Sequence, residues 1–241
     1  MYVSPEAMAD KMLMDRVLIR LDADLKKIHE LLPPAAMKPL EGVTFWVERD
    51  NPGMTMYYHG RTATGINPDK RGGIDVNSMQ KYLDGAAFKP FLVLHEMSHA
   101  YHDLVLGFDN GIVKWAFDLA VASHRYESVS RNGRKERAYA LTNEREYFAE
   151  ISSSYWGRND YYPFTRADLA QFDPPGLAMI EKVWLGASTI ASNVSSCRAM
   201  QAERPFVPCP NKAPNILLIW LARENFTFAP APVLCCGEVY T

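Results

Sequence analysis

The chain has 241 residues, of which 48% are hydrophobic and 22% are charged, and its formal net charge is -2. These proportions are typical of a globular protein with a sizeable core. A net charge so close to zero, without a run of basic residues, gives no long-range attraction to nucleic acid or to an anionic membrane, which excludes a nucleic-acid partner. The longest apolar run, residues 216–222, is much shorter than the roughly 20 residues that span a bilayer, so no membrane span is expected.

Helical and strand patterns succeed each other in the first part of the chain. Ser4 and Pro5 are typical of a helix N-terminus, and apolar residues then recur at helical spacing until Pro33. Three segments rich in strand-forming residues follow this helix, at 42–47, 54–58 and 73–76. A further helix is predicted from Pro90 to about residue 106, because its apolar side chains, Leu104 among them, gather on one face.

The next part of the chain combines a helix, a hairpin and a second long helix. Apolar spacing predicts a helix through residues 112–120. Asn132-Gly133 is a strong type I′ turn signal. The predicted arms on either side of this turn are residues 126–129 and 137–140. Thr142 or Asn143 then caps a helix that continues through Tyr155. Early strands followed by later helices predict an α+β fold with a small N-terminal mixed sheet.

The composition changes near residue 188. Beyond this point charged residues become sparse and prolines frequent, which is typical of irregular, loop-rich structure. Residues 1–188 are therefore predicted to form one domain, and residues 189–241 an extension. The extension holds all four cysteines (Cys197, Cys209, Cys235 and Cys236) and two glycosylation-type triplets that begin at Asn193 and Asn225. These features favour export, with any signal peptide already removed because the first residues show none.

The segment His95-Glu96-Met97-Ser98-His99 matches the pattern H-E-x-x-H. On a helix, residues four apart lie about 6 Å apart along the axis and on one face, so the two imidazoles converge on one ion, as tetrahedral zinc requires. Glu96 is rotated by about 100° from His95, so it projects beside the metal and can accept a proton from an activated water molecule. The sequence therefore predicts His95 and His99 as zinc ligands and Glu96 as the general base.

A catalytic zinc site of this type needs a third protein ligand. His102 lies about 10 Å along the helix axis from the first histidine and does not close a tetrahedron, so we assign it, with Asp103, to supporting or surface groups. Val105 stands where the metzincin pattern has its third histidine, which excludes that class. Glu146 and Glu150 are better candidates, because they share one helix face beside aromatic residues, where carboxylates are costly unless paired or metal-bound.

The segment from Tyr139 to Glu150 reads Y-A-L-T-N-E-R-E-Y-F-A-E. Together with the H-E-x-x-H helix it resembles the gluzincin-type peptidases, specifically the catalytic domain of anthrax lethal factor and related peptidases. In that domain a helical H-E-x-x-H precedes a Y-x-x-T-N-E-x-E-F-F-A-E segment. The likeness covers about residues 91–160, and Glu146 lies 47 positions after His99, a spacing similar to that of the family.

The resemblance implies a zincin-like metallopeptidase domain over residues 1–188, with one zinc ion per chain. It implies that Glu146 completes the ligand set with His95 and His99, and that the phenol of Tyr139 assists at the substrate carbonyl. It further implies that Glu144 and Glu150 are supporting groups around the site.

These predictions together describe a zinc-dependent endopeptidase acting on a peptide or protein substrate. Glu96 would take a proton from the attacking water and deliver it to the departing amine. Zincins commonly align the substrate as an added strand along a sheet edge, and the predicted edge consists of Gly73, Ile74, Asp75 and Val76.

Two alternatives stay open. The first is a zinc-binding protein of the same fold that binds peptides or partners without cutting them; the presence of both Glu96 and Tyr139 argues against it, because binding alone needs neither. The second is a structural domain without metal, which leaves the charged residues on apolar helices unexplained.

Overall fold

The computed structural model describes residues 1–53, 55–58 and 67–186, and the elements below belong to the unit Met1–Cys197. The predictions for residues 189–241, including the cysteines and the glycosylation triplets, lie outside the described residues, as does the boundary at residue 188. None of the helices in the described residues is long and apolar enough to cross a membrane.

Four short strands form a mixed sheet in the order β1-β2-β4-β3. The strands are β1 (Tyr2–Val3), β2 (Phe45–Val47), β3 (Met56–Tyr57) and β4 (Ile74–Val76). The first three strands in this order run parallel, with Phe45 opposite Ile74, and β3 runs antiparallel to β4. The prediction of a small mixed sheet near the N-terminus is confirmed. Strands β2, β3 and β4 are shorter than their predicted segments, and β1 was not predicted.

The prediction that Gly73, Ile74, Asp75 and Val76 form the sheet edge is wrong. Strand β4 has β2 on one side and β3 on the other, so both sets of its backbone hydrogen-bonding groups are used within the sheet. These four residues are buried, and a Cβ on Gly73 would lie 2.7 Å from the carbonyl oxygen of Thr44. In the described residues β3 pairs with β4 alone, so the edge nearest the metal-binding motif is β3.

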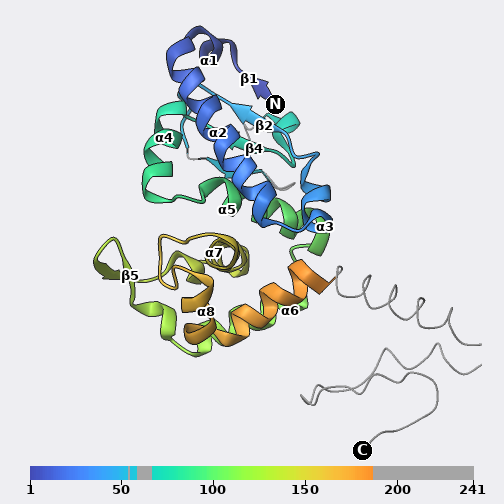
Figure 1. Ribbon diagram of the computed structural model, residues 1–241, viewed down its shortest axis with the longest axis vertical. Coiled ribbons are helices and arrows are strands. Elements are labelled where there is room, and N and C mark those ends of the chain that lie inside the picture. Colours follow the sequence, from blue (N-terminus) through green and yellow to red (C-terminus); the bar gives the residue numbers. More distant parts are fainter. Residues whose placement is uncertain (54, 59–66, 187–241) are drawn as a thin grey trace, which may run out of the picture. The chain divides into compact units, whose positions relative to one another are not determined.

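The sheet is covered by the N-terminal helices (Figure 1). The predicted first helix is two helices, α1 (Pro5–Ala9) and α2 (Lys11–Leu31). Asp10 separates them because its side chain accepts a hydrogen bond from the backbone of Leu13 and so starts a new helix. The buried face of α2 belongs to the same hydrophobic core as the central strands. The N-cap predicted at Ser4 is confirmed by its hydrogen bond from the Ala7 N–H.

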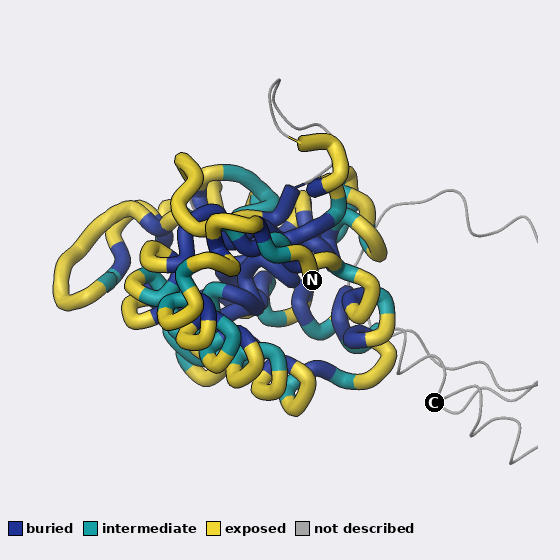
Figure 2. Tube along the Cα trace, turned by 90° about the horizontal axis from the view of Figure 1, so that it is seen from above, coloured by how far each residue is buried: buried dark blue, intermediate teal, exposed yellow. Residues whose placement is uncertain are grey.

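The remaining elements of the unit, apart from a hairpin described below, are helical. They are α3 (Pro34–Met37), η1 (Lys38–Leu40), η2 (Pro68–Lys70), α4 (Met79–Phe88), α5 (Leu92–Tyr101), η3 (His102–Leu106), α6 (Gly111–Ala122), η4 (Arg125–Glu127), η5 (Tyr139–Leu141), α7 (Glu144–Trp156) and α8 (Arg166–Phe172). Residues 174–186 are also helical. Helix α5 contacts α2 and α7, so it lies in the middle of this unit, where buried residues concentrate (Figures 1 and 2).

The predicted turn at Asn132-Gly133 is confirmed, but its arms are shorter than expected. Strands β5 (Val129–Arg131) and β6 (Arg134–Glu136) pair around the turn, and both turn residues have positive φ, as a type I′ turn requires. The chain forms the short helix η4 before β5 and the short helix η5 after β6. A single backbone bond, from the Ala138 N–H to the Tyr126 carbonyl at 2.9 Å, continues the pairing.

The unit is thus mixed α+β, mostly helical, with one small mixed sheet and a two-stranded hairpin. This confirms the predicted fold class at the level of α+β.

Candidate metal centre

The H-E-x-x-H motif lies on α5, in the interior of the protein. His95 and Glu96 are 3% and 5% exposed, and Leu94 and Met97 are buried in the core. The helix continues beyond Tyr101 as the π-helix η3. A π-turn is wider than an α-turn and rotates the residues that follow it, and Leu104, which we expected in the core, is exposed.

Helix α7 places the carboxylates opposite this motif. Asn143 is its N-cap, and the Asn143 side chain accepts hydrogen bonds from the backbone N–H groups of Arg145 and Glu146 at 3.0 Å. Of the two predicted caps, Thr142 and Asn143, the structure therefore selects Asn143. Because α7 packs against α5, Glu146 in its first turn faces the two motif histidines.

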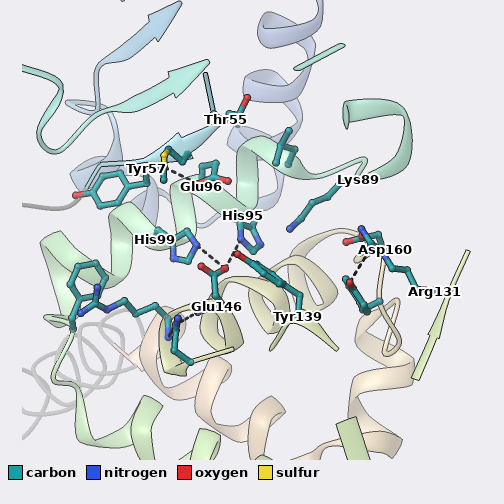
Figure 3. A pocket seen from close by; sticks show the side chains of 17 residues that line it. Thr55, Tyr57, Lys89, His95, Glu96, His99, Arg131, Tyr139, Glu146 and Asp160 are labelled. Atoms are coloured by element: carbon teal, nitrogen blue, oxygen red, sulfur yellow. Dashed lines mark hydrogen bonds and ion pairs between the residues drawn. The ribbon is translucent and has the colours of Figure 1, made fainter. Parts of the chain in front are cut away.

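Three side chains converge at one point (Figure 3). Glu146 Oε2 lies 3.2 Å from His95 Nε2 and 3.3 Å from His99 Nε2, and the three ligand atoms all lie within 4.8 Å of one another. Ligands at about 2.0–2.1 Å around a tetrahedral zinc ion lie about 3.3 Å apart. The donor set and its spacing therefore fit a metal ion of this kind, so this group could hold one.

The other ring nitrogen of His95 faces Glu150. Glu150 Oε1 lies 3.2 Å from His95 Nδ1 and accepts a hydrogen bond from the Lys89 ammonium at 2.8 Å, while Glu150 Oε2 accepts one from the Asn159 amide at 2.9 Å. A carboxylate on the far nitrogen of a ligand histidine holds the ring orientation and leaves Nε2 free to bind metal. The structure thus gives Glu150 contacts that suit the predicted supporting role.

The charges of this group stabilise one another. Burial and Lys89 lower the pKa of His95, but the neighbouring carboxylates of Glu146 and Glu150 outweigh them and raise it to about 9. Burial disfavours the ionised form of Glu146, yet hydrogen bonds from His95 and His99 hold its pKa well below the usual range. Burial also acts against ionised Glu150, and Lys89 and His95 hold its pKa well below the usual range. Both carboxylates are therefore ionised at neutral pH, the form that binds metal, whereas His95 is protonated without a metal and would release that proton on binding one.

Glu96 points toward the edge strand and is not part of the ligand group. Its Oε2 accepts a hydrogen bond of 2.8 Å from the backbone N–H of Tyr57 (Figure 3). Glu96 also lines the cavity in front of His95 and His99. This placement, beside the metal-binding atoms and open to the cavity, suits a group that accepts a proton from water.

Tyr139 lies in the turn η5, immediately before α7, and not in the predicted strand that leads into the helix. It still reaches the site: its ring centroid is 6.5 Å from that of His95, and it lines the cavity with 41% of its surface exposed. Burial and the nearby Glu146 raise the pKa of Tyr139, so its hydroxyl stays protonated and able to donate a hydrogen bond.

The structure places the other predicted supporting residues, Asp103, Glu144 and His102, in different surroundings. Asp103 accepts a hydrogen bond of 2.8 Å from the Tyr57 hydroxyl, so it touches the site through the edge strand. Glu144 does not line the cavity in the described structure. His102 is fully buried, with its ring against Phe108 and Phe148, and is neither a member of the ligand group nor a surface residue. Burial lowers the pKa of His102 to about 4, so it is neutral at neutral pH.

The site opens into a cavity of about 640 Å³. Met56 and Tyr57 of the edge strand and the preceding Thr55 contribute to its wall, while Lys89 and Asp160 line the side beyond Tyr139 (Figure 3). Asp160 is paired with Arg131 at 2.9 Å. His95, His99 and Glu146 line the same cavity, so their side chains are accessible from it.

Sequence reasoning missed three residues that contact the site: Tyr57, Lys89 and Asn159. Each lies far along the chain from the motif or on a different element, and none has a local spacing that indicates its partner. Helix α4, which ends just before Lys89, carries polar and charged residues of its own, so the sequence gives no signal that Lys89 meets a carboxylate.

A scan against models of known protein families, a search of curated proteins and a search of solved structures each found no match.

Proposed function

We propose that this chain is a zinc-dependent endopeptidase of the gluzincin type. The observation that carries the proposal is the convergence of His95 Nε2, His99 Nε2 and Glu146 Oε2 at the floor of an open cavity, with Glu96 beside them. Two imidazoles and one carboxylate leave a fourth position of a tetrahedral ion for water or substrate, which is typical of catalytic zinc sites. The resemblance of residues 91–160 to lethal-factor-type peptidases supports the same reading, including a zincin-like fold.

The chain's own residues divide the chemistry between them. When bound, zinc would supply an acidified water molecule and polarise the scissile carbonyl. Glu96 takes the proton of the attacking water and delivers it to the departing amine. Tyr139 donates a hydrogen bond to the carbonyl oxygen as negative charge develops there. Glu150 keeps the ring of His95 oriented through Nδ1.

The substrate is proposed to lie along β3. This strand borders the cavity, and its outer edge has no strand partner in the described residues. An extended peptide can therefore lie along this edge and pass in front of the ligand atoms, where the outward N–H of Tyr57 is already bonded to Glu96 and the outward carbonyl of Tyr57 is left to pair with the peptide. The proposed substrate-binding edge is thus β3 and no longer β4, because β4 is paired with a strand on each side.

Digestion of a mixed peptide library tests the proposal. We expect the purified chain to cleave peptides internally, to lose that activity with a chelator, and to regain it when zinc is added. Cleavage that persists after the metal has been removed and shown absent by metal analysis would contradict the mechanism. Zinc binding without turnover of any peptide would instead favour a zinc-dependent binding protein of the same fold.

Removing the hydroxyl of Tyr139 tests its role at the oxyanion. We expect Tyr139→Phe to fold and to bind zinc like the wild type, and to lower kcat by roughly 10–10³-fold with a smaller effect on KM. Steady-state kinetics and metal analysis of the same preparations provide both readouts. A shift in thermal stability with kcat near the wild-type value would make Tyr139 a structural residue and leave the zinc site in place.

A further inference from the structure

Tyr57 touches the active helix at two points. Its backbone N–H donates to Glu96 Oε2 at 2.8 Å, and its hydroxyl donates to Asp103 Oδ2 at 2.8 Å. Glu96 and Asp103 are seven residues apart, about two helical turns. One residue of the edge strand therefore links Glu96 on α5 to Asp103 on η3, the continuation of that helix. Figure 3 shows the first of these two contacts, between Tyr57 and Glu96.

The direction of this N–H follows from the pairing of the strand. Tyr58 donates its N–H inward, to the Gly73 carbonyl at 2.9 Å. Because backbone groups alternate in direction along a strand, the N–H of Tyr57 points outward, to the free edge of the sheet. The acceptor that the structure places there is the carboxylate of Glu96.

The contact leaves the two oxygens of Glu96 in different states. Oε2 is held by the backbone of β3, whereas within the described residues Oε1 has no hydrogen-bond partner. A carboxylate held by one oxygen has less rotational freedom than one held by neither, so its other oxygen is kept in a defined direction at the cavity wall. A general base needs this placement as much as it needs basicity.

The hydroxyl of Tyr57 anchors this arrangement. The residue is 5% exposed, and burial, with the hydrogen bond to Asp103, raises the pKa of the phenol well above its ordinary value. The hydroxyl therefore remains a donor over the whole working pH range. Since β3 is only two residues long and pairs with one strand in the described residues, a bond from its side chain to η3 is a substantial part of what holds it against the helix.

We propose that Tyr57 is a positioning residue for the general base. The hydroxyl of Tyr57, hydrogen-bonded to Asp103, holds the edge strand in place. The backbone N–H of Tyr57 then fixes Glu96 with one carboxylate oxygen available to the cavity. The effect on catalysis rests on the proposed function, while the contact itself is independent of it.

Hydrogen exchange of the amide of residue 57, measured by NMR on the full chain with and without zinc, tests the contact. In the wild type this amide should be protected. We expect Glu96→Ala to speed its exchange by about 10-fold or more, and Tyr57→Phe or Asp103→Ala to speed it by about 3–10-fold. The amide of Tyr58, bonded within the sheet, should exchange at the wild-type rate in all three variants and so reports that the strand is still paired.

Kinetics test the consequence. Tyr57→Phe and Asp103→Ala should each lower kcat by about 10-fold, with KM and zinc content within about twofold of the wild type. The double variant should be no slower than either single variant, because both remove one bond. Asp103→Asn keeps an acceptor oxygen and should restore most of the rate. Tyr58→Phe, at the residue that follows the strand and outside the cavity, is the matched control and should not change kcat.

Each result decides between the alternatives. An amide 57 that is unprotected in the wild type, or whose exchange does not respond to Glu96→Ala, overturns the contact. A normal kcat in both Tyr57→Phe and Asp103→Ala overturns the positioning role, even if melting temperature falls. Absence of peptide cleavage by the wild type itself would instead refute the peptidase proposal, and the exchange rates would still show whether Tyr57 holds Glu96.

Discussion

The Glu96→Gln variant is expected to bind one zinc ion per chain as the wild type does and to lose peptidase activity by about 10²–10⁴-fold. The amide has the same shape and its oxygen can still accept the Tyr57 N–H, so the local structure should be preserved. The amide cannot accept a proton from water at neutral pH, so the variant removes only the proton transfer from the attacking water. Turnover of the best library peptide and metal analysis of the same sample measure the two properties separately.

A matched control for this variant is Glu41→Gln, which makes the same change at an exposed position outside the cavity. It should leave kcat and KM at their wild-type values. Turnover in Glu96→Gln that equals the wild-type rate would show that the observed cleavage comes from another site or from a contaminating peptidase.

The second large effect is expected for Glu146→Ala, which removes the carboxylate that both ligand histidines face at 3.2 and 3.3 Å. We expect zinc affinity to fall by more than the roughly 10–100-fold that is typical of changes in groups surrounding a metal site. Activity at limiting zinc should be lost with it. Competition against a chromophoric chelator measures the affinity directly.

Glu150→Gln shows whether the correct carboxylate was chosen as ligand. Because Glu150 contacts the far nitrogen of His95, this variant should lose only about 10–100-fold in zinc affinity. Glu41→Ala removes a carboxylate from the surface and should have no effect. If Glu146→Ala retains full zinc occupancy while Glu150→Gln loses it, the third-ligand assignment is wrong and the two glutamates exchange roles.

The sequence by itself determined the features that depend on neighbouring residues. The spacing of His95 and His99 places both rings on one helix face wherever that helix lies, because helical geometry is local. The turn at Asn132-Gly133 is similarly set by φ values within a few residues, and the cap of the glutamate helix was narrowed to Thr142 or Asn143, of which the structure shows Asn143. For the same reason the α+β class and the glutamate helix were predictable.

The tertiary structure decided which distant groups meet. Glu146 reaches His95 across 51 residues of chain, Lys89 reaches Glu150 across 61, and Tyr57 reaches Glu96 across 39. No local preference specifies such contacts, because they depend on how α5, α7 and the sheet pack together. The edge of the sheet was misassigned for the same reason: a strand's own residues do not show which neighbours will take its backbone groups. Only the packed fold shows that β3, and not β4, faces α5 with its outer N–H on Glu96.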